Sequence, residues 1–190
     1  MKAKLLTLLF LCLLLGGGIL YDYSAVPPQK TLGNFEKTIK KQEAKLAPVF
    51  PFQTLDGRIF ESLEALEEPV IILNFWASWC VPCVVEMPDM LELVKEFKGQ
   101  VALVAVSIDG KKSDVEGFKT KLSQRFGDVV DSDHVYWVWD ENKDISLKKF
   151  NVIKVPETIL LDQKRGMLRK IVGEFDWKGQ EIRKNLLKIL

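Results

Sequence analysis

The hydrophobic positions of this chain change their spacing from one stretch to the next. Residues 69–76 and 101–108 are almost continuously apolar, as is typical of strands that are buried on both faces of a sheet. Residues 81–97, which lie between them, repeat their apolar positions at helical spacing and therefore predict a helix. Pro88 falls inside that helix, so we expect a kink there. A strand, a helix and a second strand in this order predict a parallel crossover unit.

The same patterns extend on both sides of this unit. Residues 50–53 and 58–60 flank an Asp-Gly pair, which is a strong signal for a hairpin. Towards the C-terminus the spacing predicts alternating strands and helices, and the last helix is amphipathic (strands over residues 135–139, 158–161 and 168–172; helices over residues 115–126, 145–150 and 177–190). Parallel crossovers, then an antiparallel pair of strands and a closing helix, predict a mixed α/β sandwich.

The chain opens with a short basic segment and a long apolar one. Lys2 and Lys4 precede residues 5–21, which carry no charge and suit either a signal-peptide core or a short membrane span. Positive charges stay on the cytoplasmic side of a membrane, so we expect the remainder of the chain to be exported. No well-formed small-residue cleavage site follows, which favours an uncleaved anchor. The sequence predicts an anchor, a polar tether and a folded domain (residues 1–21, 22–46 and 47–190).

Composition narrows the function classes. The 27 basic and 26 acidic residues give a net charge of +1, which offers no electrostatic basis for binding nucleic acid. The 3 cysteines are too few for a disulfide scaffold. Cys12 lies in the apolar N-terminal segment, and the bulky residues before it argue against lipidation, so we interpret it as an apolar residue of the anchor. The chemistry is therefore expected at Cys80 and Cys83.

Cys80 and Cys83 enclose Val81 and Pro82 at the predicted start of the helix. Unpaired N–H groups at a helix N-terminus favour a thiolate over a thiol, and the thiolate is the nucleophile. We expect Cys80 to be the exposed, attacking thiol, and Cys83 to be the shielded thiol that resolves a mixed disulfide. Proline suits the first helical turn, because its missing N–H would have had no partner there. The pattern predicts a redox-active disulfide and no other cofactor.

Half of a zinc site is the main alternative for a Cys-x-x-Cys pair. Structural zinc takes four ligands, usually from a second cysteine pair or from two histidines. This chain has no second pair, and its 1 histidine, His134, stands in a polar stretch where we expect it to be solvent-exposed. The sequence therefore predicts no metal site.

The run from Asn74 to Cys83 (Asn-Phe-Trp-Ala-Ser-Trp-Cys-Val-Pro-Cys) resembles the active-site signature of thioredoxin-fold proteins. Two further matches, Glu-Met-Pro at residues 86–88 and Val-Pro-Glu-Thr at residues 155–158, resemble the TlpA/ResA branch, which includes the cytochrome c maturation thioredoxins. The resemblance spans residues 47–190. It implies a thioredoxin-like three-layer α/β/α sandwich with a mixed central sheet.

The resemblance also implies how a substrate docks. Pro156 is expected to be a cis proline that packs against the two cysteines and exposes the backbone of Val155 to an extended substrate segment. Trp79, Val81 and Pro82 are expected to shape the surface that the partner meets. An ordinary trans proline at the start of a strand is the alternative for Pro156.

Proton handling is where the chain departs from thioredoxin. Thioredoxin carries a buried aspartate in the strand before the motif, and the matching position here is Asn74, which cannot titrate. The resemblance to ResA-like members implies Glu86, one turn beyond Cys83, as the replacement. We expect Glu86 to act as an acid/base or to tune the cysteines electrostatically, with a raised pKa if its side chain is buried. A solvated glutamate at a helix N-terminus is the alternative.

The motif and the resemblance together predict a membrane-anchored, extracytoplasmic thiol–disulfide oxidoreductase. We expect it to reduce disulfides in cysteine-containing exported proteins, with apocytochrome c as one candidate, and to be re-reduced by a membrane thiol donor. A disulfide-forming oxidant or isomerase uses the same residues, so the direction of electron flow stays open. The physiological substrate, the donor and the oligomeric state stay open as well.

Three other functions fit the residues less well. Copper-handling proteins of this fold have a wider cysteine spacing and a downstream histidine. Peroxiredoxins have a threonine at the position where Ala77 stands. A non-catalytic docking module on a membrane tether would have no need of an intact cysteine pair.

Overall fold

The computed structural model describes residues 45–190. The predicted anchor and nearly all of the predicted tether lie outside the described residues, which include the whole of the predicted folded domain. Over residues 45–190, no helix is both long enough and apolar enough to cross a membrane.

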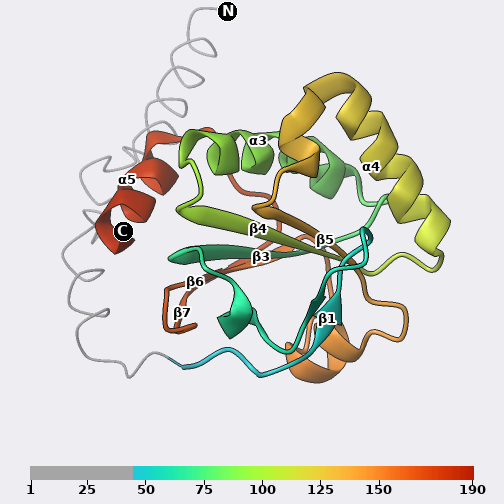
Figure 1. Cartoon of the computed structure of the whole chain (residues 1–190), viewed down its shortest axis with the longest axis horizontal. Coiled ribbons are helices and arrows are strands. Elements are labelled where there is room, and N and C mark those ends of the chain that lie inside the picture. Colours follow the sequence, from blue (N-terminus) through green and yellow to red (C-terminus); the bar gives the residue numbers. More distant parts are fainter. Residues whose placement is uncertain (1–44) are drawn as a thin grey trace, which may run out of the picture. The chain divides into compact units, whose positions relative to one another are not determined.

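A five-stranded sheet forms the centre of the fold, in the order β5-β4-β3-β6-β7. The central strands β3 and β4 pair in parallel and are buried along their whole length, which explains their continuous apolar runs. β5 pairs in parallel with β4, whereas β6 pairs antiparallel with both β3 and β7 (Figure 1). The mixed sheet is confirmed (β3, Val70–Trp76; β4, Val101–Ser107; β5, Val135–Trp139; β6, Glu157–Leu161; β7, Met167–Val172).

Two long helices, α3 and α4, cover one face of this sheet, and α5 lies beside α3 (Figure 1). Trp76 of β3 points to this face and packs against Phe118 of α4, with ring centroids 4.7 Å apart. The guanidinium of Arg183 on α5 lies 2.8 Å from the carboxylate of Glu96 on α3. α3 continues through Pro88 without ending. The bounds of the three helices are close to those predicted (α3, Val81–Glu96; α4, Lys112–Phe126; α5, Gln180–Ile189).

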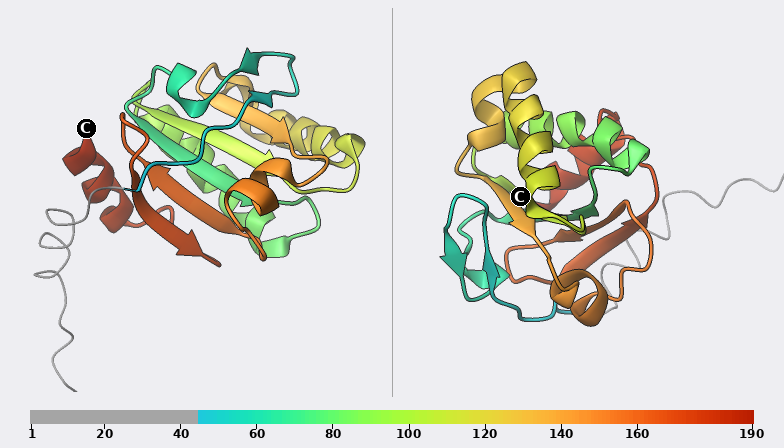
Figure 2. Two further views of the ribbon diagram at one scale, coloured as in Figure 1. Left: turned by 90° about the horizontal axis from the view of Figure 1, so that it is seen from below. Right: turned by 90° about the vertical axis from the view of Figure 1, so that its right-hand side faces the viewer.

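Short elements cover the opposite face of the sheet (Figure 2). Phe75 of β3 points to this face and packs against Phe150, with ring centroids 5.2 Å apart. The predicted hairpin forms here, although its strands are short. The sheet therefore has α-helices on one face and short elements on the other (β1, Phe52–Gln53; β2, Ile59–Phe60; η2, Leu63–Ala65; η4, Asp144–Lys149). A further short turn, η3 (Gly127–Asp131), follows α4.

The helix predicted over residues 145–150 is a single π-helical turn, η4. The carboxylate of Asp140, which is buried, accepts the N–H of Ile145 at 3.1 Å and the N–H and hydroxyl of Ser146 at 2.7 and 2.6 Å. These bonds satisfy donors at the start of the turn that have no partner within it. Apolar spacing predicts a helical segment, but it does not reveal this capping carboxylate.

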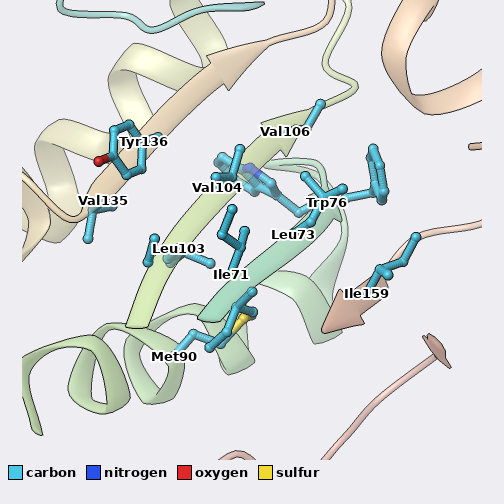
Figure 3. Packing of buried hydrophobic residues seen from close by; sticks show 14 of the residues in the cluster. Ile71, Leu73, Trp76, Met90, Leu103, Val104, Val106, Val135, Tyr136 and Ile159 are labelled. Carbon is cyan, nitrogen blue, oxygen red and sulfur yellow. The ribbon is translucent and has the colours of Figure 1, made fainter. Parts of the chain in front are cut away.

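The core fills both sides of the central strands. It contains side chains from β3, β4, β5, β6 and α3. Met90 of α3 packs among them (Figure 3). Trp137 of β5 is also buried, and its indole N–H donates to the carbonyl oxygen of Val130 at 2.9 Å. Most buried polar atoms of aromatic residues have such a partner, whereas the indole N–H of Trp76 has none among residues 45–190.

His134 is partly exposed, where the sequence predicted a solvent-exposed residue, and its ring also has a buried partner. Its Nδ1 lies 2.7 Å from a carboxylate oxygen of Glu68, and the hydroxyl of Tyr136 donates to the same oxygen at 3.0 Å. Glu68 is buried, and a buried carboxyl group is costly unless hydrogen-bond partners surround it. The imidazole ring therefore serves as a partner for Glu68 while it remains partly exposed.

Candidate active site

The cysteine pair stands where the chain passes from β3 into α3. β3 ends at Trp76 and α3 begins at Val81, so Cys80 is the N-cap residue. The N–H of Cys83 donates to Sγ of Cys80 at 3.3 Å, which makes this sulfur the capping acceptor of the helix. Pro82 lies in the first turn, where no N–H is required. Once the pair is reduced, the same N–H and the positive end of α3 favour a thiolate at Cys80.

Cys80 and Cys83 form a disulfide. Cys80 is 6% exposed and Cys83 is 1% exposed. The prediction of an openly exposed Cys80 is therefore wrong for the oxidised protein, because the bond to Cys83 holds Sγ over the first turn of α3. The predicted order of accessibility is present all the same, since Cys80 is the more exposed of the two residues.

Asp109 fixes the loop that leads into the pair. Its carboxylate is buried and accepts the N–H of Ser78 at 2.9 Å and the hydroxyl of Ser78 at 2.8 Å. The hydroxyl of Ser107, at the end of β4, donates to the same carboxylate at 2.7 Å. The segment between Trp76 and Cys80 is thereby tied to the neighbouring strand. Sequence reasoning missed Asp109, and its only signal was an acidic residue directly after an apolar strand.

The Val155–Pro156 peptide bond is cis, as the resemblance implied. β6 begins directly after it at Glu157, which pairs in the sheet with Phe75 near the end of β3. This register brings the loop to the same edge of the sheet as the cysteine pair. Across the described residues, neither the N–H nor the carbonyl oxygen of Val155 takes part in a hydrogen bond. The backbone of Val155 therefore has both of its polar groups available at this edge.

Apolar side chains stand out into solvent around the pair. Trp79 is 65% exposed, Val81 is 72% exposed and Val85 is 67% exposed. Val81 and Val85 are one turn apart on α3, so they share a face of the helix. Large exposed apolar side chains gathered at one place are typical of surfaces that meet a partner. Their role as substrate contacts, together with that of Pro82, stays a prediction.

Glu86 is buried, so the alternative of a solvated glutamate is wrong. It is 6% exposed, and its Oε2 accepts the indole N–H of Trp177 at 2.7 Å. Its other oxygen, Oε1, has no hydrogen-bond partner among residues 45–190. A pocket next to the cysteine motif opens over this side chain (lined by Val81, Pro82, Val85, Glu86, Asp89 and Glu174, among others).

Burial raises the pKa of Glu86 above its ordinary value, because the charged carboxylate is poorly solvated. The indole N–H of Trp177 opposes this shift by favouring the carboxylate, and the nearby carboxylates of Glu174 and Asp89 add to it. The pKa of Glu86 is raised overall, as the sequence predicted for a buried side chain.

Asn74 lies in β3 and is fully buried. Its amide nitrogen donates to the hydroxyl oxygen of Thr158 in β6 at 2.9 Å, across the strand pair. A buried amide at this position fastens two strands together and carries no titrating proton. Glu86 is therefore the buried acid that the structure offers near the pair on α3.

A second buried acid, Glu157, follows the cis proline. Its carboxylate lies 2.8 Å from the ammonium group of Lys170 on β7. Sequence reasoning missed this pair because the two residues meet only through the pairing of β6 with β7. For the metal question, no group of three or more His, Cys, Asp and Glu side chains that suits a metal ion occurs within residues 45–190.

Comparison with known proteins places these features in a family. A family model described as thioredoxin-like matches residues 68–167. The thioredoxin-like protein YneN of Bacillus subtilis is 35% identical over 148 residues, which cover 77% of this chain and 81% of YneN. The thiol-disulfide oxidoreductase ResA of Bacillus cereus is 31% identical over 143 residues, which cover 75% of this chain and 76% of ResA.

Solved structures agree with this assignment. A putative thiol:disulfide interchange protein DsbE from Chlorobium tepidum superposes with a TM-score of 0.64 at 25% identity, over 78% of this chain and 97% of that chain. StoA from Bacillus subtilis superposes with a TM-score of 0.57 at 25% identity, over 75% of this chain and 98% of that chain. The chain thus belongs to the thioredoxin-like family, among the thiol–disulfide oxidoreductases similar to ResA.

Proposed function

We propose that this protein is a membrane-anchored, extracytoplasmic reductase of disulfides in exported proteins. Apocytochrome c is the first candidate substrate, and a membrane thiol donor is the proposed reductant. The observation that carries the proposal is a hydrogen bond at the start of α3, which the N–H of Cys83 donates to Sγ of Cys80. This bond favours the Cys80 thiolate, which is the form that attacks a disulfide. The similarity to the thiol-disulfide oxidoreductase ResA supports the thiol–disulfide chemistry.

The reduction proceeds through a mixed disulfide. The thiolate of Cys80 attacks one substrate sulfur, a bond forms between them, and the other substrate sulfur leaves as a thiolate and takes up a proton. Cys83 then loses its proton and attacks Sγ of Cys80. The bond between Cys80 and Cys83 forms while the substrate sulfur that was bonded to Cys80 leaves and is protonated. Two electrons pass from the cysteine pair to the substrate; one proton comes from Cys83, and the other, which Cys80 released on ionising, comes from solvent.

Glu86 is the proposed acid/base for the second step. It is buried one turn beyond Cys83 and lines the pocket beside the motif. A carboxyl group with a raised pKa exchanges a proton at a pH closer to neutrality than an ordinary glutamate does. In this proposal, Glu86 accepts the proton of Cys83 and returns it to the departing substrate thiolate.

The substrate segment is proposed to lie along the loop that precedes β6. The free N–H and carbonyl oxygen of Val155 offer an edge for backbone pairing beside Pro156. Trp79, Val81 and Pro82 would then contact the side chains that flank the substrate cysteine. The predicted anchor over residues 1–21 would keep this site at the outer face of the cytoplasmic membrane.

The midpoint potential of the Cys80/Cys83 pair tests the direction of the reaction. The full chain, purified in detergent, is equilibrated against dithiothreitol or glutathione buffers. We expect a value closer to the roughly −270 mV of thioredoxin than to the roughly −120 mV of a strong oxidant. A potential near the oxidant would reverse the direction and favour disulfide formation, and no reversible couple would overturn the oxidoreductase proposal.

The roles of the two cysteines are tested separately by trapping. Cys83→Ser retains the attacking thiol and lacks the resolving one, so we expect it to accumulate a mixed disulfide with a substrate peptide. Cys80→Ser is the matched control and should accumulate none. The reverse pattern would exchange the two roles.

A further inference from the structure

We propose that Trp177 is a positioning residue of the active site, which holds the carboxyl group of Glu86 by Oε2 beside the pocket next to the cysteine motif. This inference rests on the proposed role of Glu86 in the thiol–disulfide reaction. It adds a residue that lies 91 positions away in the sequence and in a different part of the fold.

The contact between the two side chains is short and buried. The indole N–H of Trp177 donates to Oε2 of Glu86 at 2.7 Å, and both side chains are buried. Phe175 packs edge-on against the indole, with ring centroids 5.0 Å apart. An indole N–H donates and never accepts, so it cannot relay a proton. Trp177 therefore holds the carboxyl group by one oxygen without taking part in proton transfer.

The second oxygen of Glu86 is buried. Oε1 has no hydrogen-bond partner in the described part of the chain, and Glu86 lines the pocket together with Val81 and Pro82 of the cysteine motif. A buried carboxyl oxygen without a partner costs free energy unless it carries a proton or meets a donor from the pocket. The hydrogen bond from Trp177 is therefore the side-chain contact that holds this carboxyl group in place.

Charged groups from two parts of the chain face this carboxyl. Asp89 projects from α3, and its carboxylate lies 2.9 Å from the ammonium group of Lys178. Glu174 and Asp176 line the pocket from the segment between β7 and α5. The carboxylates of Glu174 and Asp89 raise the pKa of Glu86 further. The N–H of Trp177 is the strongest influence in the opposite direction, so its removal should raise the pKa of Glu86.

The pH dependence of alkylation of reduced Cys80 by iodoacetamide tests this, measured on the full chain. Ionised Glu86 disfavours a nearby thiolate, so its titration adds an inflection to the profile. Trp177→Phe keeps an aromatic ring but removes the N–H, and we expect this inflection to move up by about one pH unit, a roughly tenfold change in the ionisation equilibrium. Glu86→Gln should abolish the inflection, and Trp177→Phe should change nothing further in that background.

Trp137→Phe is the matched control. It removes another buried indole N–H, whose acceptor is the carbonyl oxygen of Val130, and it should leave the inflection in place. Trp177→Phe contradicts the proposal if it leaves the profile unmoved. A shift of equal size in the Glu86→Gln background also contradicts it, because the effect would then not pass through Glu86.

A second measurement needs no change at Trp177 and covers the case in which Trp177→Phe does not fold. One indole N–H resonance of the wild-type chain should shift with pH in step with Glu86 and lose that shift in Glu86→Gln. The proposal would be overturned if none of the indole N–H resonances shifted with pH. The redox couple of the same wild-type sample decides the proposed function independently: a missing couple rejects the function, whereas a normal couple with unmoved profiles rejects only the role of Trp177.

Discussion

Asp109 and Glu86 are both buried carboxyl groups near the cysteine motif, and they differ in how many donors reach them. Both oxygens of Asp109 accept hydrogen bonds, from the N–H and hydroxyl of Ser78 and from the hydroxyl of Ser107. Glu86 accepts the indole N–H at Oε2, and its Oε1 has no partner within residues 45–190. A fully satisfied carboxyl makes its surroundings rigid, whereas an oxygen without a partner makes the ionised form of a buried carboxyl costly.

Asp109→Ala should destabilise the protein by about 3 kcal/mol, because it leaves buried donors of Ser78 and Ser107 unpaired and each unpaired donor costs about 1–3 kcal/mol. The free energy of unfolding in urea measures the loss. Ser107→Ala removes a single hydroxyl from the same cluster and should cost about 1 kcal/mol. Equal losses in the two variants would show that the carboxylate does not hold the loop.

At this scale, the sequence predicts residues whose signal is local and misses those whose partner is distant. Cys80, Cys83 and Pro156 could be singled out because their neighbours in the chain carry the pattern. The contact between Trp177 and Glu86 could not be predicted, since it joins positions 91 residues apart and neither residue stands in an unusual local sequence. Only the packing of α5 against α3 brings the two together.

The position of Trp177 beside Glu86 depends on how α5 packs. Ile182 and Leu186 form its buried side, and Arg183 pairs with Glu96 on α3. Trp177 precedes α5 by a short turn, so the seating of the helix determines where the indole lies. The helix therefore links the end of the chain to the pocket beside the cysteines.

Ile182→Ala should cost about 3 kcal/mol of stability, because it leaves a cavity beneath α5. Leu187→Ala, on the exposed side of the same helix, should change stability by less than about 0.5 kcal/mol. Urea denaturation followed by circular dichroism gives both values. Similar losses for the two variants would mean that α5 does not pack through the side that contains Ile182.

Most elements could be predicted from the sequence because each has one dominant environment. β3 and β4 are apolar apart from Asn74 and Ser107 since both of their faces are buried, and α3 alternates since one side meets the sheet. The position of η4 could be predicted from the sequence, but its helix type could not. The carboxylate of Asp140, which lies outside the segment, determines the hydrogen bonds at its start. The start of α5 was predicted too early, because Trp177 is buried in the loop that precedes the helix.

At the scale of the molecule, the proposed recognition of a substrate protein would depend on local features and not on overall charge. The net charge of the chain is +1, so it supplies little long-range steering. Apolar contact at Trp79, Val81 and Val85, and backbone pairing at Val155, are the features available beside the disulfide. Such a surface suits an extended or unfolded chain that presents a cysteine, which is the form in which exported proteins cross a membrane.

The N-terminal segment decides whether this site reaches exported proteins. Alkaline phosphatase is active only where its own disulfides form, so fused after Leu190 it reports the side of the membrane on which the chain ends. We expect an active fusion that resists extraction with carbonate, and an inactive one once residues 1–21 are deleted. Lys2→Glu with Lys4→Glu should lower the activity, because positive charge before the apolar stretch sets its orientation. An active fusion released in soluble form would mean that the segment is cleaved. Activity without residues 1–21 would contradict the export signal itself.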